Sequence, residues 1–401
     1  MVVREVPGGI RHTVVERPGG RTVVAYGRGG YVQHGFVAKG GQAYVQRSYY
    51  VNGRAYSRVY RPYSYRGVMV NIYAPPRYYA PAFYQYAYSP WGTPIRYGGW
   101  GWQGNPWYGV YGGFFTPYPV YASPAMWLTD YMIAASFQSA YQSRMEAGGG
   151  YVNNFAEPMT PELKQQIANE VRGNLQRQQA EAQGNGQNPT GSLPILDSRP
   201  HILQVYTNMN AAGANGECAL TESDIVEFDG TQPVDGVNAN VFVKYSKAQD
   251  CPANTMASVP VDQLQEMSNH MLESMEQGLA EFQKNQGRSG LPALTPAMTT
   301  TRPAFFANEI PPAEPNVQME LLQASTEGAA ALGEAGAPGD SGPAPGGKSG
   351  EPPTLTLGMN QDQVAGILGD PVRRAIVGSK VILFYKDLKI TLENGAVTDI
   401  Q

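Results

Sequence analysis

The sequence contains few of the residues that build catalytic and metal sites. Of its 401 residues only two are cysteine and four are histidine, and Asp, Glu, Lys and Arg together make up 15%. The histidines stand far apart, at His12, His34, His201 and His270. None has a second His or Cys at the spacing of zinc ligands, and the chain has no Gly-x-Ser-x-Gly elbow. The sequence therefore predicts a protein that is not an enzyme and that holds no metal and no cofactor.

One short segment has the letters of a phosphate-binding loop, Gly346-Gly347-Lys348-Ser349. Such a loop needs a strand before it and a helix after it, whereas this segment lies in Pro/Gly-rich sequence. We therefore assign it no nucleotide. The two cysteines are not in a Cys-x-x-Cys redox pair, and no motif supports a catalytic Cys–His dyad with His201. A hydrolase that uses one of the cysteines as its nucleophile therefore stays a distant third hypothesis.

Long hydrophobic runs are also missing. Residues 1–9 contain no apolar segment of the length that a signal peptide needs. The most apolar stretch, residues 126–135, is too short to span a membrane and is interrupted by Asp130. A transmembrane segment is therefore not predicted. Because the chain opens within a repeat, we expect the natural N-terminus, with its signal peptide, to lie upstream of Met1.

Glycine and proline are abundant, with 47 and 32 residues. Together they make about a fifth of the chain, above a usual share of roughly 12%, which favours small folded units with Gly/Pro-rich connections. The net charge is −4, yet residues 1–150 carry about fourteen Arg and Lys against about four Asp and Glu. The basic first third is suited either to attract the acidic remainder of the chain or to bind an anionic surface.

The N-terminal region is predicted to form hairpins. Residues 1–62 repeat Gly pairs around Thr-Val-Val runs, which suit tight turns and strands. Asn52-Gly53 is a strong type I′ turn signal, and alternation puts four side chains of the strand before it on one face: Val45, Arg47, Tyr49 and Val51. Residues 63–150 are rich in Tyr, Trp, Gly and Pro, so we expect an irregular aromatic-packed or disordered region that ends in a helix at 127–145.

Residues 158–287 are predicted to form a helix–β–helix domain. Thr160 and Pro161 are the cap and first residue of a helix that runs to about Gln183, and a second amphipathic helix covers about 262–286. Cys218 and Cys251 lie between them among strand-like runs, and they indicate one disulfide of an exported protein. The alternative is two unpaired thiols in a cytosolic protein. Residues 288–353 are predicted to be a linker, with a short helix at 317–322.

The C-terminal residues 354–401 indicate one helix, 361–368, followed by a three- to four-stranded antiparallel sheet. They carry Leu357-Gly358-Met359, Leu368-Gly369-Asp370-Pro371, Phe384-Tyr385 and Leu392-Glu393-Asn394-Gly395. On these residues the segment resembles the SmpA/OmlA (BamE-type) module of outer-membrane lipoproteins, although it has no lipobox cysteine. The resemblance implies an extracytoplasmic interaction module. The wider layout, including Glu217–Thr221 and Asp250-Cys251, resembles large exported proteins of soil bacteria.

A candidate anion-binding surface is formed by arginines interleaved with tyrosines, at Arg47, Arg54, Arg58 and Arg61. Such a surface suits nucleic acid or an envelope glycan, and the third interpretation is a structural coat of Arg–Tyr stacking.

The sequence as a whole predicts an α+β protein of several modules. We expect a non-enzymatic exported or cell-envelope protein, periplasmic, surface-bound or secreted, that binds a protein or an envelope glycan. The alternative is a basic aromatic nucleic-acid-binding protein of the cytoplasm. Nothing in the sequence indicates an oligomeric state.

Overall fold

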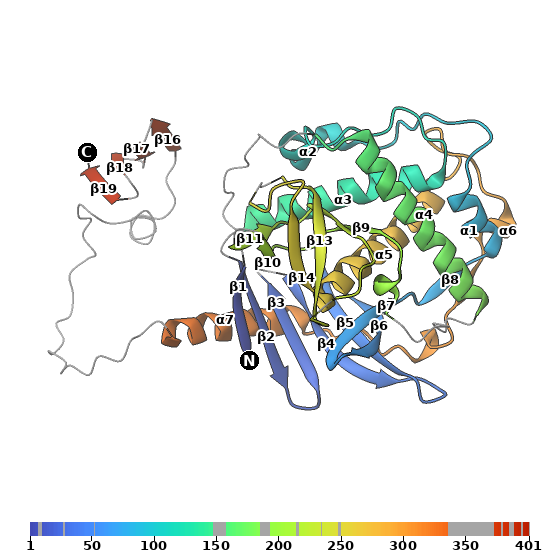
Figure 1. Cartoon of the computed structure of the whole chain (residues 1–401), viewed down its shortest axis with the longest axis horizontal. Coiled ribbons are helices and arrows are strands. Elements are labelled where there is room, and N and C mark those ends of the chain that lie inside the picture. The colour runs from blue at the N-terminus through green and yellow to red at the C-terminus, as the bar shows by residue number, and fades with distance from the viewer. Residues whose placement is uncertain are drawn as a thin grey trace. The chain divides into compact units, whose positions relative to one another are not determined.

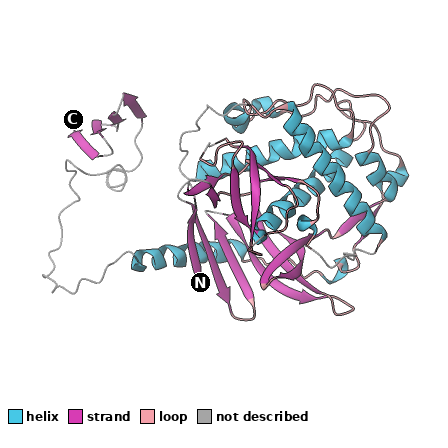
Figure 2. Cartoon of the chain, viewed as in Figure 1, coloured by secondary structure: helices cyan, strands magenta, loops and turns pink. Residues whose placement is uncertain are grey.

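The computed structural model describes residues 1–6, 10–26, 29–51, 53–146, 158–184, 193–213, 216–233, 235–247, 250–335, 373–377, 380–384, 389–393 and 396–400. It is a mixed α and β structure (Figure 2) with two compact units, Met1–Ala337 and Pro338–Gln401. None of the described helices is long and apolar enough to cross a membrane.

Seven of the described strands form a curled antiparallel sheet in which each strand pairs with the next one along the chain (Figure 1). Alternating apolar and polar residues joined by glycine turns produce this meander, and Gly53 has the positive φ of 79° that its tight turn requires. Asn52, the other half of that turn signal, lies outside the described residues. The strands are β1 (Val2–Val6), β2 (Ile10–Arg17), β3 (Arg21–Tyr26), β4 (Gly29–Val37), β5 (Ala43–Val51), β6 (Arg54–Tyr65) and β7 (Val68–Ala74).

The sheet continues beyond residue 62, where the sequence predicted a boundary. Pro62 lies inside β6 and pairs with Asn71 of β7. Proline fits there because the pairing of β6 with β5 ends at Tyr60, so the missing N–H faces no strand on that side. The expectation of an irregular or disordered region from residue 63 is therefore wrong for β6 and β7.

A second antiparallel sheet has the order β11-β10-β14-β13-β12-β9. Most of its strands lie where β-branched and aromatic residues predicted them. β10 was not predicted, because Met-Asn-Ala-Ala-Gly has a low strand propensity and is held by pairing with β11 and β14. The bounds are β9 (His201–Gln204), β10 (Met209–Gly213), β11 (Gly216–Leu220), β12 (Ile225–Phe228), β13 (Asn238–Tyr245) and β14 (Met256–Pro260).

The helix α5 (Val261–Lys284) packs against β7 of the first sheet and against β9, β13 and β14 of the second (Figure 1). Its predicted apolar seam is buried, including Leu264, Met271 and Phe282. The helix α4 (Pro161–Gln183) also follows the prediction, and the Thr160 Oγ1 accepts a hydrogen bond of 3.2 Å from the Leu163 N–H.

The aromatic segment that follows β7 in the chain and leads into α3 (Pro124–Glu146) is packed and ordered. Trp127, Tyr121 and Phe137 are fully buried in the main core. Asp130, which interrupts the apolar stretch, is also buried; its carboxylate accepts a hydrogen bond of 2.8 Å from the Tyr121 hydroxyl and forms an ion pair of 2.6 Å with the Lys164 ammonium. The shorter elements of this unit are β8 (Arg77–Tyr79), α1 (Pro81–Tyr88), η1 (Trp102–Gly104), α2 (Pro106–Tyr111) and η2 (Pro194–Leu196).

Residues 288–335 are folded, which corrects the predicted linker. They contain α6 (Pro296–Thr299), β15 (Thr301–Pro303), η3 (Ala307–Glu309) and α7 (Val317–Ala335). α7 covers one face of the first sheet, where Leu321 packs with Val23 and Val32 in a small separate core. An ion pair of 2.9 Å between Arg17 and Glu327 and a second of 2.8 Å between Arg21 and Glu320 hold it there. Residues 336–353, the rest of the predicted linker, lie outside the described residues.

The second unit contains four described strands in a meander, β16 (Arg373–Val377), β17 (Lys380–Phe384), β18 (Lys389–Glu393) and β19 (Ala396–Ile400). The predicted antiparallel sheet is therefore present, with Ile390, Leu392 and Val397 buried. The predicted helix at 361–368 lies outside the described residues.

Candidate binding site

One face of the first sheet is turned toward α5. The polar side chains on this face come from the predicted hairpin, which is formed by β5 and β6. Arg47 pairs with Arg58 across β5 and β6, and Tyr49 pairs with Tyr56. Because side chains alternate along a strand, these four residues share a face. The same alternation sends Arg61 to the opposite face.

Two glutamates of α5 meet the two arginines. Arg47 is 3% exposed and donates to both carboxylate oxygens of Glu266, at 2.8 and 2.6 Å. Arg58 donates to Glu273, which also accepts the Tyr60 hydroxyl. We call Arg47, Arg58, Glu266 and Glu273 the ion-pair row. Bidentate charge-assisted bonds of this kind fix geometry as well as neutralising charge.

Burial sets the electrostatics of this row. Burial opposes the charge on Arg47, but Glu266 outweighs it and holds the pKa of Arg47 well above its usual value. Burial raises the pKa of Glu273, and Arg58 offsets this only in part. The guanidinium of Arg47 also lies 4.1 Å from the centroid of the Tyr60 ring and 4.4 Å from that of Tyr31. The ion-pair row is therefore a network of paired charges that packs against aromatic rings.

Asn269 joins α5 to the outer edge of β7. Its Oδ1 accepts the Tyr73 backbone N–H at 2.9 Å, and its Nδ2 donates to the Asn71 carbonyl at 2.7 Å. Gln265 donates to the same Oδ1 at 2.9 Å and fixes the amide. The Asn269 side chain thus occupies the position of a neighbouring strand and satisfies an edge that would otherwise be open.

Beside the ion-pair row, five successive strands each place one ring on the same face. The ring centroids of His12 and Tyr26 lie 5.5 Å apart, those of Tyr31 and Tyr49 lie 5.6 Å apart, and those of Tyr49 and Tyr56 lie 5.2 Å apart. We call these five residues the aromatic stripe. Tyr56 is 36% exposed and the others are half-buried. A surface of half-exposed rings with polar tips suits binding.

The hydroxyl groups of the stripe stay protonated at neutral pH. Burial raises the pKa of Tyr31 to about 12, and it also raises the pKa values of Tyr26 and Tyr49 above their ordinary range. Near the stripe, the Tyr206 ring lies 6.0 Å from that of His270 on α5. Burial, with Arg58 as a second cause, lowers the pKa of His270 to about 4, so its imidazole is neutral.

The four arginines that were predicted to form one surface lie at different places in the structure. Arg47 and Arg58 lie together but are occupied by glutamates. Arg54 lies on the same face at the hairpin end and is exposed. Arg61 is on the other face, 4.0 Å from Glu181. The four residues therefore do not form one continuous cationic surface.

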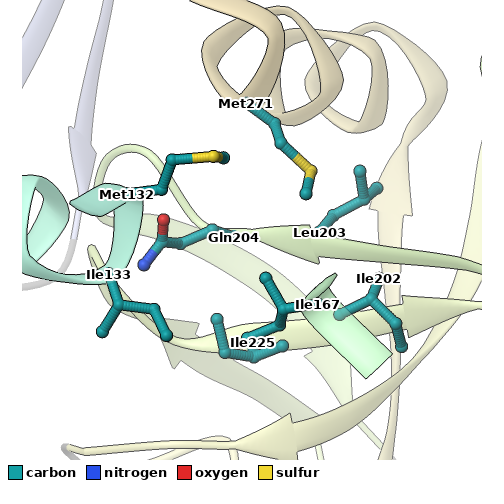
Figure 3. Close-up of a pocket in the computed structure, with 8 residues that line it drawn as sticks. All are labelled: Met132, Ile133, Ile167, Ile202, Leu203, Gln204, Ile225 and Met271. Atoms are coloured by element: carbon teal, nitrogen blue, oxygen red, sulfur yellow. The ribbon is translucent and has the colours of Figure 1, made fainter. Parts of the chain in front are cut away.

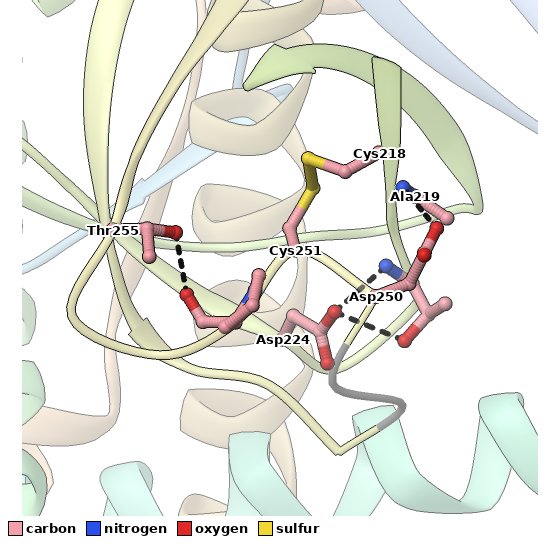
Figure 4. The surroundings of a disulfide bond; sticks show 8 residues. Cys218, Ala219, Asp224, Asp250, Cys251 and Thr255 are labelled. Atoms are coloured by element: carbon pink, nitrogen blue, oxygen red, sulfur yellow. Dashed lines mark hydrogen bonds between the residues drawn. A yellow bond between two sulfur atoms is a disulfide. The ribbon is translucent and has the colours of Figure 1, made fainter. Parts of the chain in front are cut away.

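The two cysteines form the predicted disulfide. Cys218 of β11 and Cys251 have Cα atoms 5.1 Å apart and are separated by 33 residues (Figure 4). The surroundings are hydrogen-bonded, since the Asp250 carboxylate accepts the Ala219 N–H at 2.6 Å, and Cys251 itself is fully buried. The bond therefore ties an edge strand of the second sheet to the segment between β13 and β14.

A small cavity lies in the main core between α3, α4, α5 and the second sheet. Its volume is about 10 Å³, and its lining is apolar apart from Gln204 (Figure 3). This is at most the space of one water molecule, so we read the cavity as a packing defect. Among the described residues, no group of three or more His, Cys, Asp or Glu side chains is arranged to hold a metal ion.

The acidic partners of the arginines were missed in the sequence. A signal was present, because Glu266, Asn269, Glu273 and Glu276 recur at helical spacing along one side of α5. The stripe was missed because its rings come from five strands whose register depends on four turns. The chain matches no protein-family model, no curated protein and no solved structure.

Proposed function

We propose that this chain is a non-enzymatic exported or cell-envelope protein that acts by binding a protein or glycan partner. The observation that supports it most is the disulfide between Cys218 and Cys251, which closes a 33-residue separation within the second sheet. Disulfides persist in oxidising compartments and are rare in the cytosol. The resemblance of residues 354–401 to an envelope module agrees with this proposal.

The sheet face supports a binding role over a catalytic one. Glu266 and Glu273, the two acids nearest the aromatic stripe, are each held by an arginine and so serve structure. The same pairing weakens the nucleic-acid alternative, because phosphate binding needs cations that are not already neutralised. Of the predicted arginines on this face, Arg54 alone is exposed.

The test is a thiol count on the native, unreduced protein purified from an oxidising compartment. We expect no reactive thiol after unfolding without reductant and two after reduction. Expression in a reducing cytosol is the matched control and should give a less stable protein. Two free thiols in unreduced protein from the oxidising compartment would remove the main support for export.

A further inference from the structure

We propose that Lys164 and Asp130 join their side chains through a covalent amide bond, which the folded chain forms without another protein. Lys164 lies on α4 and Asp130 on α3, so the bond ties the two helices together. It differs from the disulfide in that reductants leave an amide intact. The proposal goes beyond the proposed function and does not depend on it, because neither a binding partner nor an oxidising compartment takes part.

The amine of Lys164 is held against the carboxyl carbon of Asp130. Lys164 Nζ lies 2.6 Å from Asp130 Oδ1, so it lies at most about 3.9 Å from Cγ, the carbon to which Oδ1 is bonded. The Thr116 carbonyl accepts a hydrogen bond of 2.6 Å from the same Nζ and fixes its position. Holding two reacting groups in contact removes much of the entropic cost of bringing them together.

The other carboxyl oxygen of Asp130 is held by two donors. Its Oδ2 accepts hydrogen bonds from the Tyr118 backbone N–H at 2.6 Å and from the Tyr121 hydroxyl at 2.8 Å. Trp100 Nε1 donates to the Tyr121 oxygen at 2.8 Å and so orients that hydroxyl. Fixed donors of this kind stabilise the negative charge that develops on an oxygen when a nucleophile attacks its carbon. Among the described residues Oδ1 meets no donor other than Lys164, so Oδ1 is the oxygen that can leave.

Burial favours the uncharged forms of both groups. The side chains of Lys164 and Asp130 are 4% and 0% exposed. Burial lowers the pKa of Lys164 and raises the pKa of Asp130, although each group attracts the charge of the other. A proton that passes from Nζ to Oδ1 converts the ion pair into a free amine and a carboxylic acid. A desolvated amine is the nucleophilic form of lysine, and the Tyr118 ring covers it at 3.7 Å from the ring centroid.

The reaction is a condensation that releases one water molecule. The Nζ lone pair forms a bond to Cγ, and Oδ2 carries the negative charge of the tetrahedral intermediate. The Cγ–Oδ1 bond then breaks. Oδ1 leaves as water with two protons, one that it took from the ammonium and one that Nζ releases as the amide forms. Nothing is oxidised or reduced, and the exclusion of bulk water opposes hydrolysis of the new bond.

The experiment is mass spectrometry of the full chain, denatured in reductant so that the disulfide makes no contribution. We expect wild type to be lighter than its sequence by the mass of one water molecule. A protease digest should yield a branched peptide that joins Lys164 to Asp130. Lys164→Arg is the matched control, because it keeps the positive charge but has no primary amine, and it should show its full sequence mass. Tyr121→Phe removes one donor to Oδ2 and should slow bond formation about a hundred-fold, so that freshly purified protein is mostly without the bond.

Circular dichroism shows whether each variant is folded, and the mass of wild type decides the proposal even if a variant is not. Three results overturn it: a full sequence mass for wild type after prolonged incubation, a water loss that persists in Lys164→Arg, or a branched peptide that joins other residues. Equal extents of bond formation in Tyr121→Phe and wild type would overturn the role given to the Tyr121 hydroxyl.

Discussion

The ammonium of Lys164 on α4 lies 2.6 Å from the carboxylate of Asp130 on α3, and the two side chains are 4% and 0% exposed. Burial lowers the pKa of Lys164 and raises that of Asp130, and each group offsets part of this shift in the other. The Lys164 Nζ also lies 3.7 Å from the centroid of the Tyr118 ring. A buried ion pair thus ties the aromatic region to α4.

Removing one partner of this pair should destabilise the protein strongly. We expect Asp130→Asn or Lys164→Met to lower the free energy of unfolding by about 3–5 kcal/mol, because each leaves a buried charge without its partner. The double variant Asp130→Asn, Lys164→Met should lose less than the sum of the two single losses. Urea unfolding followed by tryptophan fluorescence measures all three, and additive losses would contradict coupling between the residues.

The disulfide should contribute to stability as well as to location. The double variant Cys218→Ser, Cys251→Ser should lose about 3–4 kcal/mol, as the chain-entropy model gives for a loop of this length. Wild type measured in reductant should show the same loss. If reductant changes the unfolding midpoint of wild type no more than that of the double variant, the bond does not stabilise the fold.

Acid should weaken the fold through His270. Its pKa of about 4 in the folded protein lies below its ordinary value of 6.5, so the unfolded chain binds more protons between these values. The stability that the neutral ring contributes is complete above pH 6.5 and is lost as the pH falls toward 4, by about 3 kcal/mol. His270→Gln should reduce the change in the free energy of unfolding between pH 7 and pH 5. Parallel pH profiles of the two proteins would refute this role.

Gly30 should not tolerate a side chain. Its φ is +140°, and a Cβ there would lie 2.1 Å from the Val24 carbonyl and 2.6 Å from Leu321 of α7. Gly30→Ala should therefore cost more than about 2 kcal/mol and loosen α7. Gly40→Ala is the matched control, because Gly40 also has a positive φ but open space around it. Thermal unfolding and limited proteolysis compare them, and equal losses would mean that the close approach does not matter.

Local signals in the sequence predicted the local structure. Caps and apolar periodicity located α4 and α5 within a few residues, and the position of the two cysteines indicated their pairing. These features depend on residues that are near one another in the chain. The strand face that carries Arg47 and Tyr49 was likewise given by alternation.

Contacts between residues far apart in the chain could not be predicted from the sequence. Arg47 meets Glu266 more than 200 residues away, so its exposure was not visible from the surrounding tyrosines. α7 was underestimated because its Ala- and Gly-rich stretch looks like linker until Val23 and Val32 provide an apolar surface for it. In both cases a partner far along the chain decides what a local pattern becomes.

The Asn269 amide makes the two edges of the first sheet different. It terminates the hydrogen-bond ladder at β7 with a side chain, so another molecule cannot extend the sheet past Asn71 and Tyr73. In the described part of the chain, the opposite border of this sheet is β1. A strand that another molecule adds to this sheet should therefore pair with β1.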